Sequence, residues 1–216
     1  MRNLTATICL AVALLLGSAG VSWSAEPIKG YCLLGTKHSH LPIAGKCSAS
    51  YERGDYKTAL RGFKRLANKG NAATQFNLGQ MYRRGQGVQQ NYKTAVKWYT
   101  HAAKQGNPSA QTNLGAMYAN GQGVPQDYKT AVKWYRLAAE QGDADAQFGL
   151  GFMYALGRGV LKGYVYAHMW GSIASTNGNK LGANLMDDFG KKMTPAEFST
   201  AKKLVRECAL KNYKGC

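Results

Sequence analysis

Acidic side chains are scarce in this chain. Its 216 residues include 11 aspartates and glutamates against 28 lysines and arginines, which gives a formal net charge of +17 at pH 7. A surplus of this size attracts acidic partners, which can be acidic proteins, anionic glycans or lipid headgroups. The alternative is a merely solvated basic surface, because many lysines fall on the expected polar side of a helix: Lys57, Lys93, Lys97, Lys129 and Lys133.

The sequence also lacks the usual arrangements of catalytic or metal-binding residues. The acids form no set of paired carboxylates, and no Cys-x-x-Cys spacing occurs. His38 and His40 lie between Cys32 and Cys47 and could complete a zinc site, but an oxidising compartment favours disulfides at such cysteines. We therefore predict no metal, no cofactor and no catalytic residue.

Long apolar runs are absent after the first two dozen residues. Arg2 precedes the apolar run 8–16, and Ser22 and Ser24 occupy positions −3 and −1 of a cleavage site after Ser24, with Ala25 as the alternative. This pattern is typical of a secretory signal peptide, which is too short to span a bilayer. We expect a chain exported to the periplasm or secreted, with no transmembrane segment after signal removal. Export and the lack of a nucleic-acid-binding motif argue against a nucleic-acid partner.

The cysteine count fits export. Of five cysteines, Cys9 leaves with the signal, and the other four allow three connectivities. We favour Cys32–Cys47 and Cys208–Cys216, because each pair is close in sequence and flanks the centre of the chain. Small disulfide loops at these places would stiffen the two ends.

What the chain does contain is a repeat. The residues YKTAVKWY occur at 92–99 and again at 128–135, and 22 of 36 positions are identical between 91–126 and 127–162. The similarity extends over about 52–178. An active site is usually assembled once from unlike pieces, whereas a recurring stretch indicates a copied structural unit.

Each unit is predicted to form two helices. Gln111, Leu114 and Tyr118 are spaced for one face of a first helix, and Tyr128 and Ala131 begin the same rhythm in a second. Glycines inside the first helices predict close approach to alanines of the second: Gly79, Gly115 and Gly151 opposite Ala95, Ala131 and Ala167. Large rings are expected to fill the space between hairpins: Trp98, Trp134, Trp170, Tyr82, Tyr118 and Tyr154. One hairpin cannot bury its apolar face alone, so the units must stack.

The repeated pattern A-x-x-L-G-x-M-Y-x-x-G-x-G-V-x-x-D-Y-x-x-A-x-x-W-Y-x-x-A-A-x-Q-G resembles the Sel-one-like repeat, a relative of the tetratricopeptide repeat. The resemblance implies an all-α fold, an α-solenoid of stacked helix-turn-helix repeats with a 36-residue period, here with disulfide-bearing terminal caps. Two departures are local: Gly163 replaces the usual N-cap acid, and the first unit has Phe63 where later units have tryptophan.

The C-terminal segment carries its own signals. Thr194, Pro195 and Glu197 form a capping box with proline at the first helical position, and they open a predicted helix through about Leu210. We expect this segment to cap the solenoid. The predicted organisation is a signal peptide at 1–24, an N-terminal cap at 25–51, repeats at 52–178 and a C-terminal helical cap at 179–216.

Members of the resembled family act as adaptors for protein complexes, often in signalling or in the bacterial envelope. The resemblance therefore implies a non-enzymatic adaptor or regulator that binds an envelope protein. The partner is expected to bind in a groove lined by the first helices. Our candidate contact residues in that groove are Asn77, Gln80, Arg83, Arg84 and Asn113. The asparagines have an alternative role, which is to satisfy local backbone groups. A cell-wall or anionic-glycan-binding module is the second hypothesis, supported by the charge alone.

A third hypothesis comes from the resemblance, since some cysteine-rich secreted members are associated with penicillin binding or β-lactamase activity. Ser199 and Lys202 match the pattern Ser-x-x-Lys, but neither Ser-Asp-Asn nor Lys-Thr-Gly occurs in the chain. Two fixed positions are easily matched by chance, so we assign no catalysis to them.

Overall fold

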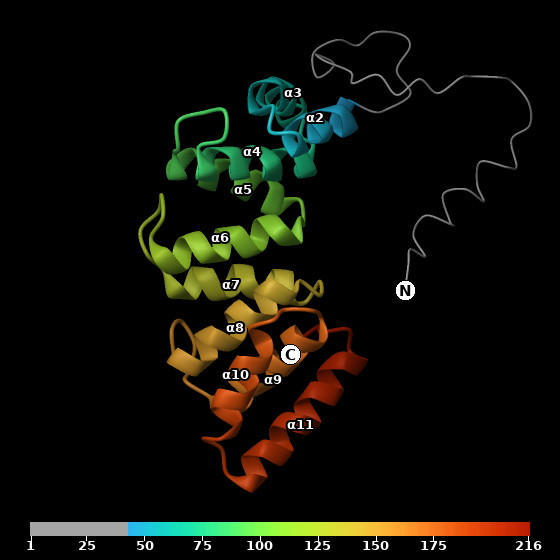
Figure 1. Ribbon diagram of the computed structural model, residues 1–216. Helices are drawn as coiled ribbons and strands as arrows, with labels where there is room; N and C mark the ends of the chain where they lie inside the picture. The colour runs from blue at the N-terminus through green and yellow to red at the C-terminus, as the bar shows by residue number, and fades with distance from the viewer. Residues whose placement is uncertain (1–42) are drawn as a thin grey trace, which may run out of the picture.

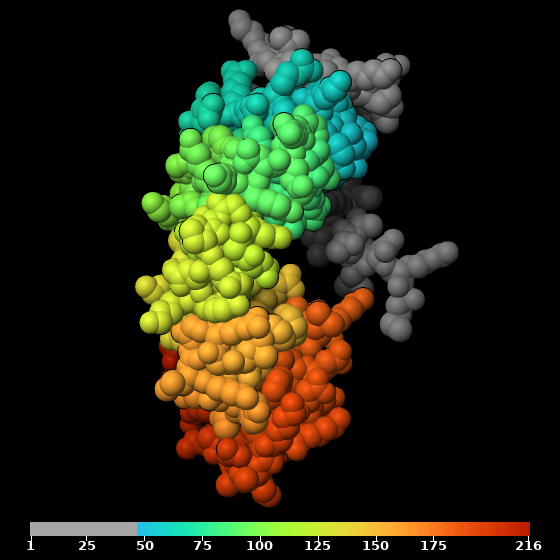
Figure 2. Space-filling model, turned by 90° about the vertical axis from the view of Figure 1, so that its left-hand side faces the viewer, coloured from blue at the N-terminus to red at the C-terminus, as the bar shows by residue number. Residues whose placement is uncertain are grey.

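A computed structural model describes residues 43–216 of the protein, with side chains described from Cys47 onward. All regular elements in this range are helices, and they stack in chain order into one elongated body (Figure 1). The helices are α2 (Ile43–Glu52), α3 (Tyr56–Asn68), α4 (Ala72–Arg84), α5 (Tyr92–Lys104), α6 (Pro108–Asn120), α7 (Tyr128–Ala139), α8 (Ala144–Leu156), α9 (Tyr164–Thr176), α10 (Gly182–Gly190) and α11 (Pro195–Leu210). The predicted α-solenoid is confirmed, and the space-filling view shows successive repeats following one another along its length (Figure 2).

Three closed hairpins form the centre of the stack: α4 with α5, α6 with α7, and α8 with α9. Asn91 and Asp127 cap the second helices α5 and α7 by accepting a hydrogen bond from the backbone N–H of Thr94 and Thr130. These bonds satisfy amide groups that a helix start leaves without partners. At α9 the cap residue is Gly163, and no side-chain hydrogen bond forms there.

The glycines inside α4 and α6 do admit a close neighbour, but that neighbour is an aromatic ring, whereas Gly151 of α8 approaches the Ala167 backbone as expected. A Cβ at Gly79 would lie 2.7 Å from the Tyr99 ring, and one at Gly115 would lie 2.9 Å from the Tyr135 ring. Tyr99 and Tyr135 are buried, whereas Trp98 and Trp134, the residues before them, are only half-buried. The neighbouring tyrosine therefore turns inward in each case, while Trp134 packs against the buried cluster of α5 and α6, where two hairpins meet, as expected.

The last repeat follows a different packing. Trp170 is fully buried, and a Cβ at Gly151 would lie 3.1 Å from its Cβ. Residue 171, one period after Tyr135, is glycine. In the first unit, buried Phe63 lies one period before Tyr99, so it takes the place of the inward tyrosine and not of a tryptophan.

Buried glutamines link each hairpin to its neighbours. The Nε2 atoms of Gln75, Gln111 and Gln147 donate to carbonyl oxygens near the end of the preceding second helix, at 3.0 to 3.1 Å. Their Oε1 atoms accept hydrogen bonds from the end of the following second helix: Gln105, Gln141 and Asn177. The repeats are thus joined by a satisfied polar ladder inside an apolar stack, where an unpaired amide would be costly.

The C-terminal end is held by covalent and polar contacts. The Cys208–Cys216 disulfide is present and closes the chain after α11. Within this loop the Tyr213 hydroxyl donates to Asn177 Oδ1 at 3.1 Å, which continues the ladder. The expected Cys32–Cys47 disulfide lies outside the described residues on the Cys32 side, and Cys47 itself is fully buried near α3.

Candidate partner-binding face

The first helices of the repeats lie on the inner side of the stack. α6 approaches α8 and α8 approaches α10, whereas the second helices α5, α7 and α9 make no comparable approach to one another. In a stack of hairpins, the side on which neighbours approach more closely is the concave side, where related solenoids bind their partners. We call the solvent-facing stripe of α4, α6 and α8 the inner face.

The structure brings most of the predicted contact residues onto this face. Asn77, Gln80 and Arg84 are spaced three and four residues apart in α4 and therefore share one side of that helix. Asn113 takes the position of Asn77 one period later, in α6. Arg84 is exposed and the other three are half-buried.

Two of these polar side chains differ in how far their hydrogen bonds are satisfied. Asn113 Nδ2 donates to the Ser109 carbonyl at 2.7 Å, within its own helix. Gln80 Oε1 is buried and accepts no hydrogen bond among the described residues. A buried amide oxygen without a donor is costly, and because this oxygen is shielded from solvent, a partner reaches it only if the Gln80 side chain turns outward. The alternative role that we gave to the asparagines, satisfying local backbone, fits Asn113 in this respect.

Arg83 lies beside this stripe and contacts the core. Its Nε donates to the Tyr99 hydroxyl at 3.3 Å. Burial raises the pKa of Tyr99, and the hydrogen bond from Arg83 opposes this rise. Burial alone raises the pKa of Tyr135 to about 12. Both tyrosines are therefore neutral at physiological pH, and Arg83 contributes a cation beside an uncharged hydroxyl.

The sequence analysis missed the apolar end of the inner face. One period after Ala116 and Asn120 come Phe152 and Leu156 of α8, whose side chains are 43% and 42% exposed. Phe152 also stacks on Phe148, with ring centroids 6.2 Å apart. Applying the 36-residue period to Gln80 and Arg84 would have found these positions. The inner face thus changes from polar and cationic at α4 to apolar at α8.

The outer side of the second helices is different in kind. The five lysines that we expected on a solvated face are all exposed: Lys57, Lys93, Lys97, Lys129 and Lys133. Within residues 43–216 the one ion pair is Lys203 with Glu207, on α11. These lysines therefore keep their charge free for solvent or for a polyanion.

The Ser-x-x-Lys match lies on the surface of α11. Ser199 and Lys202 are both exposed on α11, and the Lys202 ammonium lies 4.4 Å from the centre of the Phe198 ring. Between residues 43 and 216 no group of three or more histidines, cysteines or acids is placed to hold a metal ion. None of the helices described there is both long and apolar enough to cross a membrane.

Comparison with known proteins identifies the repeats. The family model for the Sel1 repeat matches residues 72–107, 108–143 and 144–179, which correspond to the three closed hairpins. No curated protein gives a significant match to the chain.

Two solved structures are similar in both sequence and fold. One is a protective antigen of uropathogenic Escherichia coli strains that displays an SLR fold, with 33% identity and a TM-score of 0.70. The match covers 79% of this chain but 41% of that chain, so this chain spans less than half of that protein's length. The other is a Sel1 repeat protein from Oxalobacter formigenes, with 35% identity, a TM-score of 0.66, and 78% and 69% of the two chains covered. This chain therefore belongs to the Sel1 repeat family.

Proposed function

We propose that this protein is an exported, non-enzymatic adaptor or regulator whose inner face binds a segment of another envelope protein. Sel1 repeat proteins generally mediate protein–protein interaction. The observation that carries the proposal is the inner face itself, which presents Gln80 and Arg84 at one end and Phe152 and Leu156 at the other. Arg84, Phe152 and Leu156 are solvent-exposed and therefore available to a partner, and Gln80 is half-buried beside Arg84.

The two ends of the face define the chemistry of the partner. The cationic end at α4, where Arg84 is exposed, suits an acidic side chain. The apolar end at α8 suits an aliphatic or aromatic side chain, which would bury Phe152 and Leu156. A segment that is acidic at one end and apolar at the other satisfies both.

The test is capture of envelope proteins on the mature chain at low and at moderate salt, followed by mass spectrometry. The bait variants are Arg84→Glu combined with Phe152→Ser, and Asn77→Ala combined with Asn113→Ala. Lys97→Glu, on the outer side, is the matched control. We expect one dominant protein that survives moderate salt, is retained by the control, and is weakened about tenfold or more by Arg84→Glu with Phe152→Ser. Equal retention by all variants would overturn the assignment to the inner face.

The exposed lysines of the second helices favour a second candidate, which is a module for anionic glycans or lipid headgroups. Such binding relies on unscreened charge, so it should fall steeply as salt rises. Retention by the Arg84→Glu and Phe152→Ser variant, with loss on combining Lys97→Glu and Lys133→Glu, would select this candidate. Insensitivity to both salt and the lysine substitutions would exclude it.

A further inference from the structure

The last hairpin of the molecule is open. α10 and α11 occupy the places of a further repeat, but α11 packs against α9 and makes no comparable contact with α10. Figure 1 shows the two helices diverging from the loop that joins them. In the closed repeats the corresponding helices lie along each other, for example α8 against α9. Divergence of α10 and α11 leaves a cleft between them whose floor is α9.

This cleft has the size and lining of a ligand site. Its volume is about 840 Å³, within the range of small-molecule sites in proteins. Its walls are mostly apolar and include Met186, Met193, Phe198 and Val205. Methionine side chains adapt their shape to different apolar ligands. The cleft is therefore suited to an apolar body.

A buried polar group lies at its floor. His168 of α9 is 5% exposed, and its ring meets Phe198 edge to face at 5.1 Å between centroids. Its Nδ1 lies 3.5 Å from Ser172 Oγ, while Nε2 has no hydrogen-bond partner among the described residues. Gly190 faces this edge of the ring. A Cβ added at Gly190 would lie 3.7 Å from His168 Nε2. The missing side chain keeps Nε2 accessible from the cleft.

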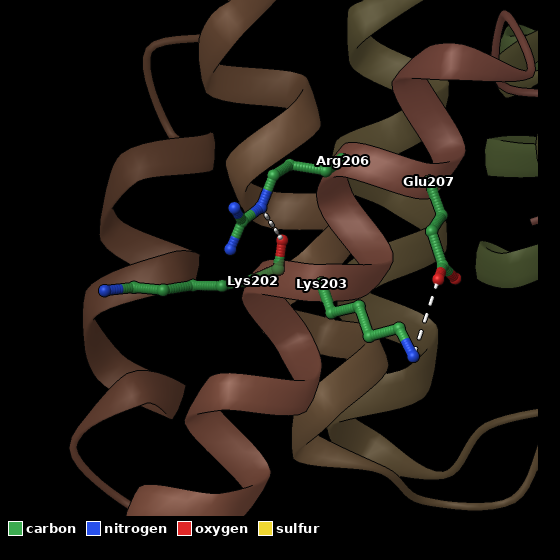
Figure 3. Close-up of polar contacts among 4 residues, drawn as sticks. All are labelled: Lys202, Lys203, Arg206 and Glu207. Atoms are coloured by element: carbon green, nitrogen blue, oxygen red, sulfur yellow. Dashed lines mark hydrogen bonds and ion pairs between the residues drawn. The ribbon is translucent and has the colours of Figure 1, made fainter.

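The rim of the cleft carries an excess of positive charge. Lys191, Lys202 and Arg206 line it together with a single carboxylate, Asp187, and none of the three cations forms an ion pair within residues 43–216. Arg206 Nε donates to the Lys202 carbonyl at 3.4 Å. Figure 3 shows the Lys202 and Arg206 side chains extending from one side of α11, while Lys203 and Glu207 pair on the other side.

From these observations we propose that the cleft between α10 and α11 binds a small amphipathic carboxylate. The apolar body lies against Phe198, Val205 and the methionines. The carboxylate faces Lys202 and Arg206 at the rim, and the imidazole edge of His168 lies at the floor of the same cleft. A cation would meet three like charges at the rim, and a neutral apolar molecule would leave those charges without a counter-ion. The site is separate from the inner face and does not depend on the proposed partner.

The test compares decanoate with decanol and with decylammonium on the full mature chain. Binding is followed by calorimetry, and the site is located by the NMR signals of the His168 ring. We expect decanoate to bind one site per chain and to shift the His168 signals. Decanol should bind more weakly, and decylammonium more weakly still.

A matched pair of variants on α11 and the loop that follows it serves the same experiment. Lys202→Gln with Arg206→Gln removes two cations from the cleft, whereas Lys203→Gln with Lys211→Gln removes two from elsewhere on the same segment. All four side chains are exposed, so helix content and melting temperature should be retained in both variants. We expect decanoate affinity to fall about tenfold in the first variant and less than about twofold in the second.

Three outcomes would overturn the proposal. Equal losses in the two variants would mean that decanoate responds to the overall charge of the chain. Equal affinity for decanoate and decanol would mean that the rim cations have no role. Shifts confined to Phe152 and its neighbours, with the His168 signals unchanged, would place the ligand on the apolar end of the inner face.

Discussion

The closed hairpins carry the 36-residue repeat, whereas the open hairpin of α10 and α11 follows the last copy of the repeat and is packed differently. In the hairpins of α4 to α7, Tyr99 and Tyr135 fit over a glycine of the first helix, and the two helices lie along each other. In the last repeat the inward tyrosine is replaced by Gly171. A Cβ there would lie 3.0 Å from the Gly182 carbonyl oxygen, so the replacement lets α10 approach α9 by backbone contact.

The difference lies where the stack of closed hairpins ends. Because α10 takes the space of the missing ring, Leu185 packs beside Gly151 and Gly171. α11 then docks on α9, where the Cys208–Cys216 loop and Tyr213 hold its far end. Closed hairpins thus continue the stack, and the open hairpin terminates it and leaves a cleft.

Removing the inward ring should break the closed hairpin most severely. Tyr135→Ala empties a buried site between α6 and α8, and we expect a loss of about 3–5 kcal/mol in the free energy of unfolding. Tyr166→Ala, at a side chain that is 41% exposed, is the control and should cost far less. Urea denaturation measures both. Similar losses in the two variants would contradict the role of Tyr135 in closing the hairpin.

Removing the disulfide should loosen the open hairpin. Cys208→Ser with Cys216→Ser releases a short loop, and the chain-entropy model gives a loss of about 2–3 kcal/mol. Hydrogen exchange should report faster opening of α11 while α4 to α7 stay protected. Uniform acceleration along the whole stack would show that the C-terminal loop supports all repeats and not the last hairpin alone.

Adding one methyl group at the α9–α10 contact tests whether the end of the stack depends on close backbone contact between these two helices. A Cβ at Gly182 would lie 2.7 Å from the Gly171 carbonyl oxygen, so Gly182→Ala should cost about 1–3 kcal/mol through overpacking. Asn184→Ala, at an exposed position of the same helix, is the control. Thermal unfolding with hydrogen exchange should place the damage at α10. An unchanged melting temperature would mean that α10 is free to move away from α9.

The smallest expected effect is a dependence on pH at the open hairpin. Burial lowers the pKa of His168, with Lys202 acting in the same direction and Asp187 against it. The unfolded chain therefore takes up the proton at higher pH than the native chain does. The contribution of His168 to stability is complete above its unfolded pKa of about 6.5 and is lost as pH falls through that value towards the native pKa.

Paired variants isolate this dependence. His168→Gln should reduce the fall in the free energy of unfolding between pH 7.5 and pH 5, and His101→Gln, at an exposed position, should leave it unchanged. This range extends about one unit above and about one and a half units below the usual pKa of histidine. Equal pH profiles for wild type and His168→Gln would show that this imidazole titrates alike in the native and unfolded chains.

Much of the fold could be predicted because the same helix pattern recurs in each copy of the repeat. The helix pairs follow from a period that recurs with 22 of 36 identities, and the capping box at Thr194 marks the start of α11. The choice between Trp134 and Tyr135 as the inward ring could not be predicted, since neighbouring positions on a helix differ by about 100° and both rings are large. The contact between α9 and α10 could not be predicted either. It depends on Gly171, which lies inside α9, and on Gly182, which begins α10, and no shared sequence pattern links the two glycines.

The inner face was partly predictable for the same reason. The 36-residue period relates each position in α4 to one in α6 and one in α8. The period links Asn77 to Asn113, which were both predicted, and it also links Gln80 and Arg84 to Phe152 and Leu156, which were not. The cleft could not be predicted, because it results from how α10 and α11 diverge and not from any local pattern. His168 shows this most clearly, since its burial depends on Phe198, thirty residues further along the chain.

The most direct test of the central claim, that the inner face binds a protein, is photo-crosslinking in the cells that produce the chain. A photoreactive phenylalanine analogue is placed at Gln80 or at Phe152 on the inner face, and at Lys97 on the outer side as control. The account predicts one discrete adduct with the same protein from both inner positions and none from Lys97. An adduct from Lys97 with none from either inner position would contradict it.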